Sequence, residues 1–340
     1  MDDSQVRLSL PSKGRMEEET KDFLDECGMR IEITNPRQYF ARIPAMPQVK
    51  VLFQRARDIA RSVIAGDVDL AITGYDTIVD TLGEDNPELV VIHEALGYSH
   101  CKLALAVPYE WHDVVDMKSL AERAARSPEG LRVATKHVNA TRSYLDRYGL
   151  QQIRTVSADG ALEAAPSIGY AELIADITST GTTLRENHLK LIEDGTVVKS
   201  QAVLVGNRKA LETRPEVRET TRQLLEFIEA HLRARGQYLV FANMRGESKD
   251  EISRRIFGQP DLGGLQGPTI SQILTRNGES GWWAINLVTA HDKLYDCVRQ
   301  VRAAGGSGVV ITPVVYIFEE YPERFRGLLK NLGLQEETGE

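Results

Sequence analysis

The sequence predicts an α/β protein in which two strand-and-helix units lie side by side and a smaller ferredoxin-like domain follows. Through most of the chain before Arg235, short apolar runs alternate with amphipathic helical patterns, as in sheets covered by helices. After Gly236 the order becomes strand, helix, strand, strand, helix, strand, which is the ferredoxin-like order βαββαβ. With 340 residues, the chain is also too long for a single core.

In the first unit, apolar runs predict strands at Val6 to Leu10 and at Val68 to Thr73. The turn Ser12-Lys-Gly-Arg15 follows the first of these strands. It leads into a helix that we expect to begin at Met16 and to end at Gly28, because glycine commonly ends helices. A second helix is predicted over Arg57 to Ala65, before the second strand.

The second unit begins after Val90 to Leu105, which is predicted to cross from one unit to the other. Its strands, separated by helices, are expected at Leu131 to Thr135, Ile153 to Ser157 and Ile174 to Ile177. The alternation predicts mostly parallel sheets, with ligands at the carboxyl ends of the strands. A helical pattern over Arg185 to Glu193 follows the last of these strands.

The C-terminal domain has six predicted elements. Its strands are Tyr238 to Met244, Ile270 to Leu274, Trp282 to Val288 and Val309 to Phe318, and its helices are Lys249 to Ile256 and Asp292 to Ala304.

The segment from Asp176 to Leu184 has the composition of a phosphate-binding loop. Its hydroxyl and glycine residues are Thr178, Ser179, Thr180, Gly181, Thr182 and Thr183. At a strand-to-helix junction, such residues offer hydroxyls and unpaired N–H groups to an anion. The loop has no lysine and is therefore not a Walker loop. Asp176 can accept hydrogen bonds from sugar hydroxyls, so phosphate and sugar together indicate a phosphoribosyl group.

A simpler interpretation of part of this loop stays open. Thr183 and Glu186 have the spacing of a capping box, so these two residues could serve only to begin a helix. That interpretation leaves five residues of the segment unexplained: Asp176, Ser179, Thr180, Gly181 and Thr182.

The wider sequence resembles the ATP phosphoribosyltransferase family, whose members catalyse the first step of histidine biosynthesis. The matching signature positions are Glu163, Gly169, Ala171, Ile174, Asp176, Thr180, Gly181, Thr183 and Leu184. Further matches are Leu10-Pro-Ser-Lys-Gly-Arg15, Arg55-Ala-Arg-Asp-Ile59, Asp69 to Asp76, and Leu131 to Lys136 with Asn139, Thr141 and Arg142. Ala60 departs from the usual proline, at a helix start rather than at a chemical group.

This resemblance implies a bilobal catalytic unit similar to periplasmic binding proteins, with a C-terminal ferredoxin-like regulatory domain. The implied limits are 1–95 with 192–235 for the first lobe, 96–191 for the second lobe with the phosphoribosyl-binding loop, and 236–330 for a histidine-binding domain. In the implied reaction, N1 of ATP attacks C1 of phosphoribosyl pyrophosphate, which releases pyrophosphate. The resemblance also implies inhibition by histidine and a homohexamer.

Roles at the site follow from the same resemblance. The loop 178–183 would hold the 5-phosphate and Asp176 the ribose hydroxyls, while Glu163 would orient ribose or magnesium. Lys13 and Arg15 are candidates for the pyrophosphate or ATP phosphates. The ATP-binding candidates are Arg15, Arg55, Asp76 and Lys136. Lone turn cations are often only solvated, Glu163 could be a surface carboxylate, and turn chemistry alone also favours Asp76.

For the effector histidine, the resemblance indicates Leu265, Thr269 and Gly308. The sequence departs from the family at Asn243 to Gly246, where an acidic residue is commoner, so weak histidine affinity is expected.

Composition excludes several classes of protein. The net charge of −8 argues against a nucleic-acid surface, although residues 37–61 carry six cations and one acid, which suits polyphosphates. Three cysteines without a Cys-x-x-Cys pair and seven histidines without ligand spacing predict no disulfide framework and no metal site built by the protein. Mg²⁺ is then expected on substrate oxygens. We expect no membrane segment and a cytoplasmic location.

Two competing functions share the predicted fold. A binding protein for a small solute would have the same two units, but an export signal is not evident and the loop would have no purpose. A prephenate-dehydratase-like enzyme would carry a Thr-Arg-Phe segment, to which Thr141-Arg-Ser143 is the nearest match. Pyrophosphate release from ATP and phosphoribosyl pyrophosphate would distinguish all three.

Overall fold

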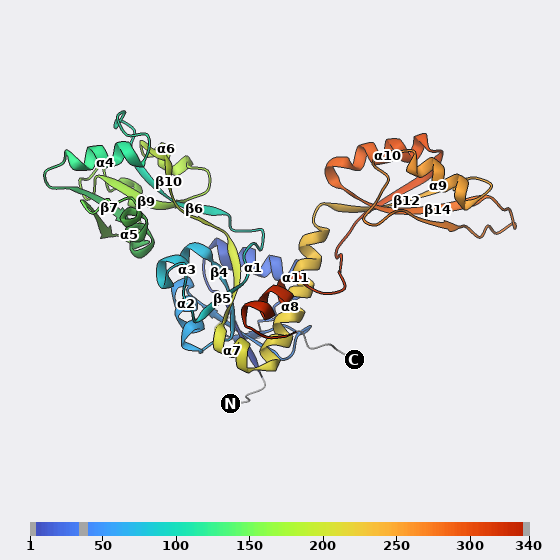
Figure 1. The fold of residues 1–340 in the computed structure, drawn as a ribbon, viewed down its shortest axis with the longest axis horizontal. Coiled ribbons are helices and arrows are strands. Elements are labelled where there is room, and N and C mark those ends of the chain that lie inside the picture. The colour runs from blue at the N-terminus through green and yellow to red at the C-terminus, as the bar shows by residue number, and fades with distance from the viewer. Residues whose placement is uncertain (1–4, 34–39, 336–340) are drawn as a thin grey trace. The chain divides into compact units, whose positions relative to one another are not determined.

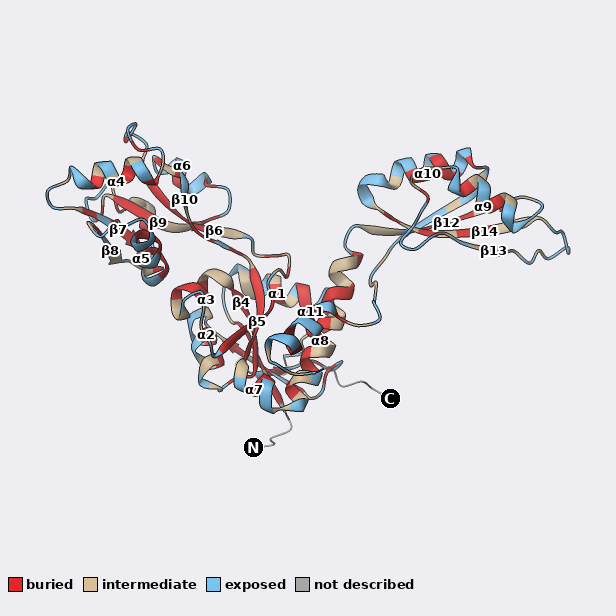
Figure 2. Ribbon diagram, in the orientation of Figure 1, coloured by how far each residue is buried: buried red, intermediate tan, exposed pale blue. Residues whose placement is uncertain are grey.

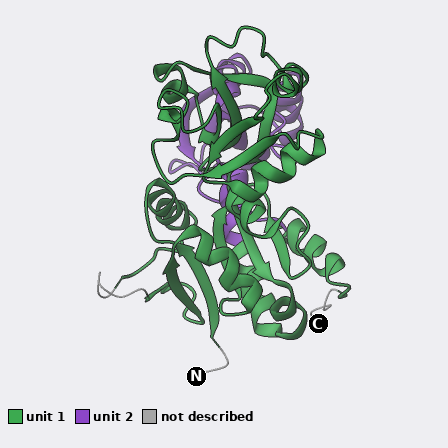
Figure 3. Cartoon of the chain, turned by 90° about the vertical axis from the view of Figure 1, so that its left-hand side faces the viewer, with its two compact units in different colours: residues 1–225, 322–340 green, residues 226–321 purple. Residues whose placement is uncertain are grey.

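The computed structural model describes residues 5–33 and 40–335, and these form two compact units. Unit 1 comprises residues up to 225 together with the C-terminal segment from 322, and unit 2 comprises 226–321 (Figure 3). The boundary lies within a single helix, α8 (Pro215–Ala234). No helix of the described chain is both long and apolar enough to cross a membrane.

The first sheet of unit 1 has six strands (Figure 1). In spatial order they are β2 (Phe40–Arg42), β3 (Val49–Gln54), β1 (Val6–Pro11), β4 (Leu70–Gly74), β11 (Ala202–Asn207) and β5 (Leu89–His93). Besides α8, the helices of this part of the chain are α1 (Arg15–Glu26), α2 (Ala56–Ala65), α3 (Tyr75–Leu82), α7 (Arg208–Thr213) and α11 (Glu323–Asn331). β1, β3 and β4 run parallel, so β3 and β4 each lead into a helix at the same sheet edge.

The second sheet of unit 1 has five strands. They are β10 (Leu189–Ser200), β6 (Cys101–Pro108), β9 (Leu173–Thr178), β7 (Leu131–Thr135) and β8 (Ile153–Ser157). Its helices are α4 (Met117–Ala125), α5 (Val138–Arg147), the short 3₁₀ helix η1 (Leu162–Ala164) and α6 (Thr182–Glu186). The chain passes between the sheets from β5 to β6 and returns from β10 to β11.

The expectation of mostly parallel sheets is wrong. β11 is antiparallel to both β4 and β5, and β6 is antiparallel to both β9 and β10. The cause is that the chain crosses between the sheets twice, from β5 to β6 and from β10 to β11. A strand that enters a sheet directly from the other sheet, without a preceding helix, runs opposite to its neighbours. The strands of unit 1 still carry a buried apolar core, drawn red in Figure 2, with Leu8, Leu70 and Leu105 fully buried.

The predicted helix over Arg185 to Glu193 is also wrong. α6 ends at Glu186, and β10 begins at Leu189 and pairs with β6. Pairing with β6 buries Leu189, Ile192 and Val198, and this burial outweighs the helical spacing of the segment.

Unit 2 has the predicted ferredoxin-like fold. Its elements are β12 (Gln237–Arg245), α9 (Lys249–Phe257), β13 (Thr269–Gln272), β14 (Trp282–Ala290), the 3₁₀ helix η2 (His291–Lys293), α10 (Leu294–Ala303) and β15 (Gly306–Pro313). The sheet order β13-β14-β12-β15 is antiparallel throughout. Its core packs strand residues such as Val240 and Ile285 against Ile256 of α9 and Val301 of α10.

Candidate functional site

Residues from both sheets of unit 1 line a cavity of about 670 Å³ at the ends of their strands, which we call the strand-end cavity. It brings together four predicted site residues: Arg55, Asp76, Lys136 and Asp176. Arg55 is the N-cap residue of α2, Asp76 lies in the first turn of α3, and Lys136 directly follows β7. Connections that follow parallel strands carry such side chains to one edge of a sheet.

Asp176 is the half-buried carboxylate of this cavity. Burial raises its pKa, while a hydrogen bond of 2.7 Å from the Ile177 N–H opposes that shift. The charge of Glu163 raises the pKa further, and those of His137 and Lys136 lower it. The structure therefore places Glu163, in η1, within electrostatic reach of Asp176, as their predicted shared role requires.

Asp76 is held in place by the strand that returns from the second sheet. The Ser200 hydroxyl donates a 2.5 Å hydrogen bond to its Oδ1, and the Asp76 N–H donates one of 2.9 Å to that hydroxyl. A Cβ atom at Gly74 would lie 2.6 Å from the same Oδ1, so any larger residue at this position would displace the Asp76 carboxylate.

The cations of the segment 37–61 do not all lie in one place. Three of its cations line the strand-end cavity: Arg55, Arg57 and Arg61. Arg42 instead pairs with Glu32 at 2.8 Å, and the Lys50 ammonium lies 4.3 Å from the Phe40 ring centroid. Arg37 lies outside the described residues.

The loop 178–183 forms a tight turn between β9 and α6. Gly181 has φ +73°, a conformation that glycine adopts without strain, and its N–H donates to Thr178 Oγ1 at 2.9 Å. The hydroxyls of Thr180 and Thr182 are 2.9 Å apart, and Arg185 donates to Thr182 Oγ1 at 3.3 Å. Ser179, Thr180, Thr182 and Thr183 are exposed.

The capping-box alternative is not realised. Gly181, which has no side chain, is the N-cap residue of α6, and Thr183 lies inside the helix. With only five residues, α6 contributes less dipole than the predicted helix would have done.

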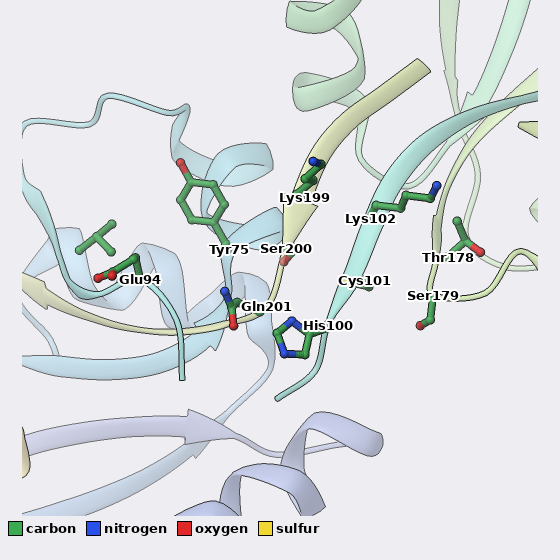
Figure 4. A pocket seen from close by; sticks show the side chains of 11 residues that line it. Tyr75, Glu94, His100, Cys101, Lys102, Thr178, Ser179, Lys199, Ser200 and Gln201 are labelled. Atoms are coloured by element: carbon green, nitrogen blue, oxygen red, sulfur yellow. The ribbon is translucent and has the colours of Figure 1, made fainter. Parts of the chain in front are cut away.

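Thr178 and Ser179 line a second cavity of about 790 Å³ rather than the strand-end cavity, and this second cavity lies where the chain crosses between the sheets (Figure 4). We call it the crossover cavity. Lys199, Lys102 and Thr178 occupy one row across β10, β6 and β9, since Lys102 is the register partner of both others. Neither lysine forms an ion pair with any residue that the structure describes. Sequence reasoning missed this pair, because only strand register reveals it.

Lys13 and Arg15 lie at the start of α1, where both are exposed. They line neither cavity. Arg15 pairs with Glu19 at 2.5 Å, yet its charge acts on Cys101 of the crossover cavity. Burial is the main cause of the raised pKa of Cys101; Asp76 adds to the shift, and Arg15 opposes it.

The three residues predicted for histidine are not gathered in one place. Thr269 is in β13 and Gly308 in β15, which are opposite edges of the unit 2 sheet. Leu265 is 58% exposed in the loop before β13. Gly308 has φ +58° and lies beside Asn243, whose buried Oδ1 has no hydrogen-bond partner among the described residues.

Comparison with known proteins agrees with this architecture. Residues 55–230 match the family model of ATP phosphoribosyltransferase, and residues 234–316 match the model of the C-terminal domain of the same family.

Among individual relatives, ATP phosphoribosyltransferase 1, chloroplastic, from Arabidopsis thaliana is 45% identical over 97% of this chain and 82% of its own length. The enzyme of that name from Brucella anthropi is 42% identical over 61% of this chain and 92% of its own length. Among solved structures, the ATP phosphoribosyl transferase (HisG:HisZ) complex from Thermotoga maritima matches with 25% identity and a TM-score of 0.51, covering 66% of this chain and 97% of that one. The chain therefore belongs to the ATP phosphoribosyltransferase family, in its long form with a C-terminal domain.

Proposed function

We propose that the two cavities of unit 1 are where this chain carries out the family's reaction, the first step of histidine biosynthesis. In this reaction the 5-phosphoribosyl group of phosphoribosyl pyrophosphate moves to N1 of ATP, giving phosphoribosyl-ATP and pyrophosphate. One observation carries the assignment: Arg55, Asp76, Lys136 and Asp176, from four separate parts of the sequence, line the strand-end cavity together.

In this proposal Asp176 accepts hydrogen bonds from the ribose hydroxyls, and the exposed hydroxyls and N–H groups of 178–183 hold the 5-phosphate. The adenine N1 lone pair forms the new bond to C1. The C1–O bond breaks, and its electron pair leaves with pyrophosphate. A side-chain nucleophile is not needed, since the adenine ring supplies the attacking atom. Arg55, Asp76 and Lys136 would bind ATP.

Cations at the crossover cavity suit the charge of the leaving group. Lys102 and Lys199 are adjacent on paired strands, where like charges repel unless an anion lies between them. Thr178 continues their row into the phosphate loop. We therefore assign these lysines, together with Arg15 and Lys13, to the pyrophosphate or ATP phosphates, because fixed cations stabilise negative charge that develops as the bond breaks.

Mg²⁺ fits the donors of this site. Burial raises the pKa of Asp176 and the charge of Glu163 adds to that shift, so a divalent cation beside the two carboxylates would relieve their repulsion. Among the described residues, no group of three or more His, Cys, Asp or Glu side chains could hold a metal. The ion would thus bind mainly substrate oxygens and water, with Asp176 and Glu163 as its protein neighbours. When bound, it neutralises charge on pyrophosphate.

The remaining proposals concern assembly and control. We propose that histidine inhibits the enzyme through unit 2 and that the enzyme is a homohexamer located in the cytoplasm. We also propose the two catalytic lobes with the limits predicted from the sequence, and a regulatory domain that begins as predicted but ends before α11, which belongs to unit 1. Because Thr269 and Gly308 lie at opposite sheet edges, a complete histidine site from these residues would need a second copy of the chain.

Histidine control is best tested in the full chain. A truncation after Gly236 would also remove α11, whose Arg324 pairs with Glu94 of unit 1 at 2.7 Å. Thr269→Ala and Gly308→Ala should instead weaken inhibition by histidine and leave uninhibited activity unchanged. Equal inhibition of wild type and both variants would contradict this assignment.

The reaction is tested by following pyrophosphate release with ATP, phosphoribosyl pyrophosphate and Mg²⁺. We expect release only when both substrates are present. A binding protein for a small solute would release none, and neither would a prephenate-dehydratase-like enzyme.

A further inference from the structure

Asp80 is a buried carboxylate of α3 that forms hydrogen bonds with the beginning of α5, a helix beside the other sheet. It is 5% exposed. Its Oδ1 accepts the backbone N–H groups of Asn139 at 3.0 Å and Ala140 at 3.2 Å. The Asn139 side-chain amide donates to the Asp80 carbonyl at 2.9 Å. Three hydrogen bonds therefore join α3, beside the first sheet, to the beginning of α5, beside the second.

These bonds replace a missing local cap. The N-cap residue of α5 is His137, and its side chain makes no cap hydrogen bond. Residues at the second and third helix positions normally donate to an N-cap side chain, and here Asn139 and Ala140 donate to Asp80. A carboxylate at this end is also favoured by the helix dipole.

The Asp80 carboxylate also contacts residues that line the strand-end cavity. Arg57 Nη2 lies 3.3 Å from Asp80 Oδ2 and also donates to the Lys136 carbonyl. His137 Nδ1 lies 3.9 Å from that Oδ2. Arg57, Lys136 and His137 all line the cavity, whereas Asp80 does not.

Both helices that Asp80 joins begin at the cavity wall. α3 begins with Tyr75 and Asp76, and α5 directly follows Lys136 and His137. A shift of α5 relative to α3 would therefore change the separation of Asp76 and Lys136. Because misplacement of binding groups by about 1 Å can cost about a hundredfold in rate, a fixed contact at this point has kinetic value.

We propose that Asp80 is a positioning residue that clamps the beginning of α5 to α3 and thereby sets Lys136 and His137 at the distance from Asp76 that the substrates require. The expected effect on kcat/KM rests on the proposed function, whereas the expected effect on the start of α5 does not.

The kinetic test compares three variants of the full chain. Asp80→Asn keeps the shape and one acceptor but loses the charge facing Arg57, so kcat/KM for ATP should fall about tenfold or more. Asp80→Glu keeps the charge and should restore part of that loss. The matched control is Glu84→Gln, which removes the Arg147–Glu84 pair (3.0 Å) between the same two parts of the molecule at an exposed place away from the cavity. It should stay within about twofold of wild type, as exposed pairs contribute little.

Unchanged kinetics in Asp80→Asn would overturn the proposal. Equal losses of kcat/KM in Asp80→Asn and Glu84→Gln would also overturn it, since any contact between the α3 region and α5 would then have the same effect as the Asp80 contact.

A second measurement does not depend on activity. Hydrogen exchange at the Asn139 and Ala140 amides should be at least about tenfold faster in Asp80→Ala than in wild type, with amides of β7 unchanged. Unaltered exchange at these two amides overturns the clamp. If wild type released no pyrophosphate but exchange accelerated as expected, the proposed function would fail while the clamp would stand.

Discussion

Replacing Asp176 with asparagine should lower the activity of the enzyme while it keeps or raises the stability of the fold. An amide keeps the shape of the side chain but weakens each hydrogen bond to a ribose hydroxyl from a charged to a neutral one, a loss of about 1 to 1.5 kcal/mol each. Two hydroxyls then give about 2 to 3 kcal/mol, which corresponds to a loss of about 30- to 150-fold in kcat/KM.

The effect on stability has the other sign. Burial raises the pKa of Asp176, so its folded pKa lies above the unfolded value. The protonated form therefore favours folding at low pH, and this contribution is lost as the pH rises through the folded pKa. At neutral pH the buried charge costs free energy that asparagine does not, so the free energy of unfolding should stay equal or rise.

Steady-state kinetics and urea unfolding at neutral pH together measure both effects. Asp159→Asn is the matched control, since Asp159 lines the same cavity with a side chain that is 81% exposed. We expect at most about a threefold change in its kcat/KM. If Asp176→Asn kept the wild-type kcat/KM, or lost activity only in proportion to lost stability, the assignment of Asp176 to the ribose would be refuted.

Three further predictions concern other parts of unit 1. Asp69→Asn should lower the free energy of unfolding by about 3 kcal/mol in urea, because the 1% exposed Asp69 carboxylate pairs with both Arg7 and Arg214; a loss below about 1 kcal/mol would show that the cluster matters little. Gly181→Val should abolish binding of phosphoribosyl pyrophosphate in calorimetry and cost about 1 to 2 kcal/mol of stability, since φ is +73°; normal affinity would remove the phosphate-loop assignment. Burial lowers the pKa of His93 from its ordinary value near 6.5 to about 4, so the folded state favours the neutral imidazole. This preference stabilises the fold fully above pH 6.5, and the free energy of unfolding should decline by about 3 kcal/mol as the pH falls toward 4. His93→Gln should flatten that decline, and an equally steep one in the variant would contradict the cause given.

The fold class and the strand-end cavity were predictable because local signals determine them. Strands at 131–135 and 153–157 have the predicted limits. The charge of Glu163 acts on the pKa of Asp176, although burial is the main cause of that shift, and the shared role of these two residues stays a prediction. The family assignment, made on the same residues, is confirmed by the family models and the Arabidopsis relative.

What the sequence did not reveal depends on pairing between distant segments. β10 has a helical spacing of apolar residues, yet it pairs with β6 because that contact buries them. The row of Lys199, Lys102 and Thr178 exists only in the register of three strands. Likewise, Asp80 lies in an ordinary helix, and only the contact with α5, 59 residues away in sequence, gives it a role. Thr269 and Gly308 were grouped by resemblance, although the sheet separates them within one chain.

The most direct test of the proposed reaction is to quantify both products in one reaction of the full chain with ATP, phosphoribosyl pyrophosphate and Mg²⁺. We predict equal amounts of pyrophosphate and of a nucleotide whose mass is that of ATP plus one ribosyl phosphate, with both falling together in Asp176→Asn and neither in Asp159→Asn. Pyrophosphate without the new nucleotide, or the new nucleotide at the wild-type rate in Asp176→Asn, would contradict the proposed transfer at this site.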